Sequence, residues 1–205
     1  MKTGLDFVSN SSPSNSSCFI VIADHGKLCS TENLRLVSTK CMSYPIPNKD
    51  YGCKEFGWQN RVYSTLEDKL NWCGIILLEL YAACRSAELK AGFIGDNVHK
   101  VCPKYEEMKE KYVKWKKMLE TVCKEKLGTW IYINLDWINL FGSKDLDSYA
   151  DLDSYAYAGI FGCYIDHQSS IFENPSNGSM FESEDALYNF LAYEESYIQC
   201  GNNNG

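Results

Sequence analysis

The chain has 205 residues, and its 27 acidic side chains outnumber its 20 basic ones, which gives a formal net charge of −7. This acidic balance argues against direct binding to the phosphate backbone of nucleic acids. The longest apolar stretch, residues 72–84, contains Glu79 and is shorter than the roughly 20 residues that cross a bilayer, so no membrane partner is expected. A chain that is 45% hydrophobic can bury a core, and its length favours a single globular domain over residues 1–205.

Ten cysteines invite a disulfide or metal interpretation. However, the sequence has no C-x-x-C pair, and Cys163 with His167 is the nearest approach to metal-ligand spacing. The N-terminus lacks the basic and apolar segments of a secretory signal, which favours a cytoplasmic location. We therefore expect reduced, mostly buried thiols, with a disulfide or a metal as the less favoured alternatives, and we assign no residue to a metal.

The first third of the chain predicts two strands and a loop. Residues 18–23 form a short β-branched run that is typical of a buried strand, and residues 34–38 alternate as in a half-exposed strand. Proline and glycine residues mark residues 44–59 as a loop.

Two long helices are predicted in the middle of the chain. Ser64 and Glu67 form a capping box that begins the first helix, which carries an apolar stripe. Pro103 suits the first turn of the second helix, and Gly128 is a natural stop for it. We expect the two helices to pack as an antiparallel hairpin over residues 64–127.

The last third of the chain returns to short elements. Residues 129–135 read as a strand, and a perfect tandem repeat of DLDSYA over residues 145–156 is interpreted as a duplication in a surface loop. Residues 157–165 predict a buried strand, residues 183–192 a short helix, and residues 196–200 a last strand. The elements together predict an α+β fold, a single domain in which a mixed or antiparallel sheet packs against the long helical hairpin.

Polar clusters follow three of the predicted strands, where side chains can leave the core and converge. Asp24 and His25 follow the first strand, residues 166–170 (DHQSS) follow the strand over 157–165, and residues 201–205 (GNNNG) follow the last one. An aspartate can fix the tautomer of an imidazole and raise its basicity, as a general base requires. For Asp24 and His25 the sequence favours a turn beside a half-buried histidine.

We hypothesise that the Ser/Asn run near the N-terminus, the segment 166–170 and the C-terminal Asn run meet in one polar pocket. His167 would be the general acid or base, and Asp166 would orient it or act as a second acid. The Ser/Asn segments would donate hydrogen bonds to a phosphate or another anion. The expected ligand-binding residues are Ser9, Asn10, Ser11, Ser12, Gln168, Asn202 and Asn203.

Several short stretches resemble one group of proteins. FVSNSSPSNSSCFIV (residues 7–21) is similar to an N-terminal F-V-S-N-S-S-S-S-S-F signature of uncharacterised proteins from tailed bacteriophages and some bacteria. FGWQ, KLNW, YIDHQSS and the ending SYIQCGNNNG also resemble one such phage group, whose ending reads closer to G-N-D-N. Pro13 and Asn15 interrupt the serine run, and Asn203 stands where that ending has aspartate, so a catalytic or metal-binding role of the aspartate would be impaired in this chain.

The resemblance implies a phage-type protein made in the bacterial host cytoplasm, and it implies no reaction. Two functional classes follow. The first is an accessory protein whose polar pocket binds a small polar or phosphorylated ligand, with catalysis left open. The second is a non-enzymatic anti-defence or host-takeover protein that inhibits a host protein by direct binding through its acidic surface. No motif specifies a cofactor.

Overall fold

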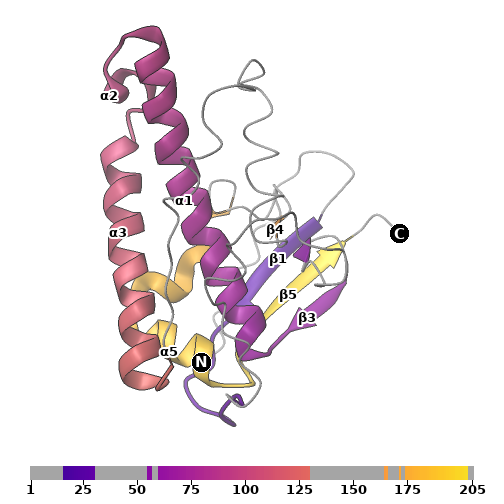
Figure 1. Cartoon of the computed structure of the whole chain (residues 1–205). Helices are drawn as coiled ribbons and strands as arrows, with labels where there is room; N and C mark the ends of the chain where they lie inside the picture. Colours follow the sequence, from indigo (N-terminus) through magenta and orange to yellow (C-terminus); the bar gives the residue numbers. More distant parts are fainter. Residues whose placement is uncertain are drawn as a thin grey trace, which may run out of the picture.

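The computed structural model describes residues 16–30, 55–56, 60–129, 164–165, 171 and 174–202. Two groups of segments make up this part of the chain: a tall helical hairpin and a small sheet beside it (Figure 1). The fold class is α+β, as the sequence predicts. The strands expected over 34–38 and 129–135 and the tandem repeat over 145–156 lie outside the described residues.

The hairpin consists of α1 (Leu66–Ile94) and α3 (Tyr105–Thr121), joined at its tip by α2 (Val98–Val101). The two long helices run in opposite directions, which confirms the predicted hairpin (Figure 1). Tyr81 and Tyr112 meet across it with ring centroids 5.4 Å apart. A π-helical turn, η1 (Val122–Lys126), extends α3 toward its end near Gly128, which has a positive φ of 65°.

Two predicted helix starts are corrected by the structure. Thr65, not Ser64, is the N-cap of α1: its hydroxyl oxygen accepts the Asp68 N–H and its hydroxyl donates to the Asp68 carboxylate. The capping pair is therefore shifted by one residue from the Ser64–Glu67 box, because Thr65 already has the extended backbone that a cap requires. Pro103 lies outside α3, whose N-cap is Lys104.

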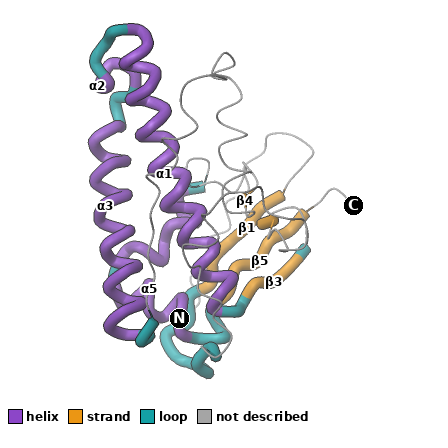
Figure 2. Tube along the Cα trace, in the orientation of Figure 1, coloured by secondary structure: helices purple, strands orange, loops and turns teal. Residues whose placement is uncertain are grey.

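The main sheet has three antiparallel strands in the order β1–β5–β3 (Figure 2). They are β1 (Ser16–Val21), β5 (Tyr197–Asn202) and β3 (Arg61–Tyr63). The predicted strands 18–23 and 196–200 are confirmed with shifted ends, whereas β3 is missing from the sequence prediction. Three residues are too few to show a clear alternation of polar and apolar side chains.

A second, two-stranded sheet pairs β2 (Glu55–Phe56) in parallel with β4 (Tyr164–Ile165). The position of β2 corrects the prediction that residues 44–59 form only a loop. β4 is the described end of the strand predicted over 157–165. A pair of two-residue strands has few hydrogen bonds of its own, so it is stabilised by packing against the core. The fully buried Phe56 of β2 provides that packing.

The C-terminal part contributes a 3-10 helix, η4 (Pro175–Glu182), and the predicted short helix, α5 (Glu184–Ala192). Ser183 caps α5 by accepting the Ala186 N–H. Gly178 in η4 lies so close to Trp115 of α3 that a Cβ atom would come within 2.8 Å of the indole ring. Trp115 also stacks on Phe181, with ring centroids 4.7 Å apart, so η4 packs tightly against the hairpin.

The main hydrophobic core joins the sheet, α1, η1, η4 and α5. Trp72 of α1 is its largest fully buried side chain, and its indole N–H donates to the Asn177 carbonyl oxygen at 3.2 Å. α1 lies between α3 and the sheet (Figure 2), so this helix is buried along much of its length. In the part of the chain that the structure describes, none of the helices combines the length and apolar character that a bilayer crossing requires.

Candidate functional site

The pairing of β1 with β5 places the ends of two predicted polar segments side by side. Ser16, the first residue of β1, is directly opposite Asn202, the last residue of β5. The Ser/Asn run therefore enters the sheet at the point where the C-terminal Asn run leaves it. Asn202 is the one predicted site residue within the described residues. The others, which lie outside them, are Ser9, Asn10, Ser11, Ser12, Asp166, His167, Gln168 and Asn203.

A disulfide ties the same two strands together. Cys18 of β1 and Cys200 of β5 are opposed in the register, their Cα atoms are 4.1 Å apart, and both side chains are buried. For Cys18 and Cys200 this bond corrects the expectation that the thiols are reduced. Two cysteines 182 positions apart cannot be matched from their spacing, because the strand register decides which of them meet. The free cysteines among the described residues are Cys29, Cys73, Cys84, Cys102 and Cys123.

The predicted catalytic segment 166–170 lies outside the described residues, but the residues on either side of it contact the core. Before it, Ile165 of β4 pairs with Phe56, whose ring lies 4.6 Å from that of Tyr63 in β3. After it, the Ile171 N–H donates to the carboxylate of Glu79 at 2.9 Å. Phe56 and Ile171 belong to the buried hydrophobic core, and the Glu79 side chain is buried as well.

Glu79 is a functional candidate that in the sequence is only a charge within an apolar stretch. It projects from the middle of α1, and its side chain is 1% exposed. Burial raises the pKa of its carboxyl group to about 7, and the hydrogen bond from the Ile171 N–H opposes that rise. A carboxyl group of this kind exchanges a proton near neutral pH beside Ile171.

We expect Glu79→Gln to change the pH dependence of stability. Between about pH 4.5 and pH 7 the folded protein keeps the Glu79 proton that the unfolded chain releases, so rising pH lowers the stability of the wild type. Gln has no such proton and can still accept the Ile171 N–H. The variant should gain about 3 kcal/mol relative to the wild type between pH 4.5 and pH 8. Urea unfolding at several pH values measures this difference, and a constant difference would contradict the assignment.

Asp24 and His25 lie at the other end of the sheet from Asn202. β1 ends at Val21, opposite Tyr197, the first residue of β5. The Asp24 Oδ1 and His25 Nδ1 atoms are 2.5 Å apart, and the two side chains are 74% and 91% exposed. Hydrogen bonding to His25 lowers the pKa of Asp24. The chain bends at Asp24 and His25, but the histidine is exposed rather than half-buried as predicted.

The chain after this turn is held against the end of α5 by a row of contacts. The Cys29 N–H donates to the Ala192 carbonyl oxygen at 2.7 Å, and Leu28 forms a bridge with Tyr193. The Lys27 N–H donates to the Glu195 carboxylate at 2.9 Å. We call residues 26–29 the strap. Glycine is favoured at its start because Gly26 has a positive φ of 155°, a backbone conformation that other residues rarely adopt.

A buried lysine lies beneath the strap. Lys69, in the first turns of α1, has no exposed surface. Its Nζ atom donates to the Tyr193 carbonyl oxygen at 2.5 Å and lies 3.5 Å from the Cys29 Sγ atom. Burial lowers the pKa of Lys69, whereas the nearby Cys29 opposes that shift. Nothing in the sequence signals this cluster, because its members are far apart in the chain and share no motif.

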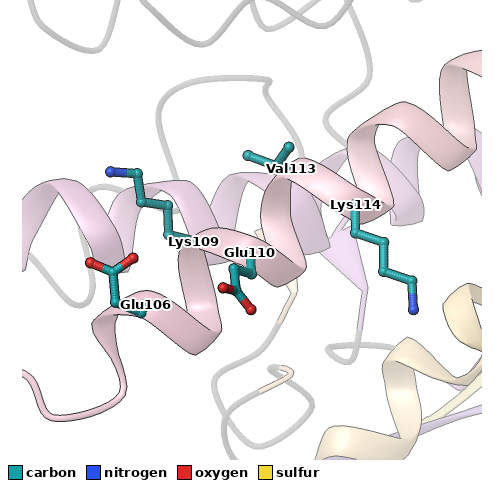
Figure 3. A pocket seen from close by; sticks show the side chains of 5 residues that line it. All are labelled: Glu106, Lys109, Glu110, Val113 and Lys114. Carbon is teal, nitrogen blue, oxygen red and sulfur yellow. The ribbon is translucent and has the colours of Figure 1, made fainter.

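A surface hollow of about 360 Å³ lies along α3 (Figure 3). Its described lining comes from this one helix. Two glutamates and two lysines, whose charges balance, surround Val113. These residues are Glu106, Lys109, Glu110, Val113 and Lys114. A balanced, one-helix surface provides neither a field for a charged ligand nor the convergent polar groups of a binding site.

Among the described residues there is no group of three His, Cys, Asp or Glu side chains arranged to hold a metal ion. Comparison with models of known protein families, with curated proteins and with solved structures finds no match for this chain.

Proposed function

We propose that this protein is an intracellular accessory protein of phage type that binds a small polar or phosphorylated ligand. The site lies at the end of the main sheet where β1 begins and β5 ends. The observation that supports it best is the register of Ser16 with Asn202, which joins the Ser/Asn run to the C-terminal Asn run. The proposal adds the third polar segment, residues 166–170, because the residues next to it, Ile165 and Ile171, pair with Phe56 and donate to Glu79.

The ligand class follows from the groups that the three segments contain. Serine hydroxyls, asparagine amides and backbone N–H groups are hydrogen-bond donors without a full charge, which suit a phosphate or a sugar. In this proposal Asn202 and Asn203 contact the ligand together with Ser9, Asn10 and Gln168. His167 transfers a proton, and Asp166 orients the imidazole ring of His167.

A thermal-shift screen tests the proposal. Nucleotides, phosphosugars and divalent metal ions are added in excess to the full chain, and the unfolding temperature is measured. A ligand at a hundred times its dissociation constant stabilises the folded state by about 2.7 kcal/mol, which is a visible shift. The His167→Ala variant should lose that shift. The matched control is His25→Ala, at the opposite end of the sheet, which should keep it.

A second candidate is direct binding of a host protein, and the tip of the hairpin favours it. Phe93 and Ile94, at the end of α1, are 78% and 55% exposed, which is unusual for large apolar side chains that adjoin one another. If no compound in the screen shifts the unfolding temperature, this candidate replaces the first. Phe93→Ser should then abolish binding of the host protein, whereas Val113→Ser, at an exposed apolar position of α3, should not.

A further inference from the structure

The pair of Cys29 and Lys69 brings a thiol and an amine together inside the fold. The strap fixes the Cys29 backbone on Ala192, and α1 fixes Lys69 from the other side. Their Sγ and Nζ atoms are 3.5 Å apart, which is contact distance. The two residues are 40 positions apart in the chain, so their contact is a product of the tertiary structure.

The surroundings of the pair favour the neutral form of the amine, which is its nucleophilic form. Lys69 is fully buried, and its Nζ atom also donates to the Tyr193 carbonyl oxygen. Burial lowers its pKa, which favours the neutral amine with its free electron pair. The Phe190 ring lies beside it, with its centroid 6.0 Å from Nζ. Cys29 is half-buried, so it is not fully enclosed by the fold as Cys73 and Cys123 are.

We propose that Cys29 and Lys69 form an oxidation site, in which a peroxide oxidises the thiol and the amine then captures the oxidised sulfur as a covalent S–N cross-link. This site is independent of the proposed ligand pocket. It lies at the end of the sheet where β1 ends and β5 begins, opposite the end that carries Asn202.

The chemistry proceeds in two balanced steps. First, the Cys29 thiolate attacks the O–O bond of hydrogen peroxide; the sulfur gains one oxygen as a sulfenic acid, and the peroxide is reduced to water. Second, the electron pair of the neutral Lys69 amine attacks that sulfur. The N–S bond forms as the S–O bond breaks, and the hydroxide that leaves takes a proton from the nitrogen as water. Two molecules of a free thiol reverse the cross-link by regenerating the cysteine and lysine and forming a disulfide.

The cross-link would join the strap to α1 by a covalent bond. At present the strap is held by the hydrogen bonds from Cys29 to Ala192 and from Lys27 to Glu195. An oxidised protein should therefore unfold at a higher temperature than the reduced one, by an increment that is separate from the Cys18–Cys200 disulfide.

Peptide mapping of the full chain tests the proposal. The protein is treated with hydrogen peroxide, quenched with catalase, alkylated, and digested with a protease that cleaves after both glutamate and aspartate, so that cleavage at Asp24 separates Cys29 from the disulfide-bonded Cys18. The expected product is a pair of peptides, one containing Cys29 and the other Lys69, whose joint mass is two hydrogen atoms below their sum. A thiol reductant should separate the pair. The product should be absent from Cys29→Ser and from Lys69→Met.

A control variant shows whether the cross-link is specific to Cys29, and a folding check shows whether its loss in a variant is due to misfolding. Cys102→Ser removes another half-buried thiol, near the hairpin tip, and should leave the cross-link intact. Circular dichroism shows whether Lys69→Met is folded, and Cys29→Ser serves in its place if it is not. Recovery of Cys29 only as a sulfinic acid or an alkylated thiol would overturn the proposal. A joint mass one oxygen above the expected value would also overturn the direct S–N bond.

Discussion

Reduction of the Cys18–Cys200 disulfide should lower the free energy of unfolding by about 3 to 5 kcal/mol, as removal of a native disulfide commonly does. The bond closes a loop over a sequence separation of 182, nearly the whole chain, so it restricts the unfolded ensemble strongly. For a loop of this length the chain-entropy treatment gives about 5 kcal/mol. Urea unfolding with and without a reductant measures the difference.

The double variant Cys18→Ala, Cys200→Ala is the matched control for this prediction. Its stability should be low in both conditions and should not respond to the reductant. If the wild type and the double variant respond equally, the reductant acts elsewhere and the disulfide contributes little. Mass spectrometry of the alkylated protein shows directly whether Cys18 and Cys200 are linked.

The oxidation state of this pair also bears on the proposed location. Most cytoplasmic proteins keep their thiols reduced, and persistent disulfides are typical of oxidising compartments. The structure has Cys18 and Cys200 oxidised to a disulfide, whereas the proposed location in the host cytoplasm would keep them reduced. Alkylation of the protein inside the cells, before extraction, distinguishes these two states. A Cys18–Cys200 disulfide that resists alkylation favours an oxidising compartment, and alkylated Cys18 and Cys200 favour the cytoplasm.

Trp72→Ala should lower the free energy of unfolding by about 3 to 5 kcal/mol, because it removes a large side chain from the centre of the core. Trp72 is fully buried, and Phe56 packs edge-on against its ring with centroids 5.0 Å apart. The substitution also leaves the Asn177 carbonyl oxygen without the indole donor. Chemical denaturation measures the loss.

Two further variants separate the contributions of this residue. Trp72→Phe keeps most of the apolar volume but loses the N–H donor, so it should cost clearly less than Trp72→Ala. Val113→Ala, at an exposed position of α3, should change stability by less than about 0.5 kcal/mol. An equal loss for Trp72→Phe and Trp72→Ala would mean that the hydrogen bond to Asn177, and not packing, dominates the role of Trp72.

The local elements of this protein could be predicted because each is encoded by nearby residues. The apolar stripes predicted the hairpin, and the β-branched run predicted β1. Ser183 and the apolar residues after it predicted α5. Errors arose where two local signals compete, as with Ser64 and Thr65 at the start of α1. They also arose where an element is too short to carry a pattern, as with β2 and β3.

The candidate site was only partly predictable, for a different reason. The sequence indicated that polar segments follow the strands, and the register of Ser16 with Asn202 supports the convergence of two of them. It gave no indication that Glu79 would hold Ile171, or that Lys69 would lie against Cys29. These contacts depend on how elements pack, and a buried charged side chain looks the same in sequence as an exposed one.

The sequence by itself thus determined the helical hairpin, the first and last strands and the α+β class, since helix and strand periodicities are properties of neighbouring residues. Only the tertiary structure decided which strands pair, that Cys18 and Cys200 form a bond, and which charged groups are buried among the described residues. Those outcomes are set by contacts between residues far apart in the chain. Such contacts, for example Cys18–Cys200 and Lys69–Tyr193, form only when the core has folded, so neighbouring residues in the sequence do not encode them.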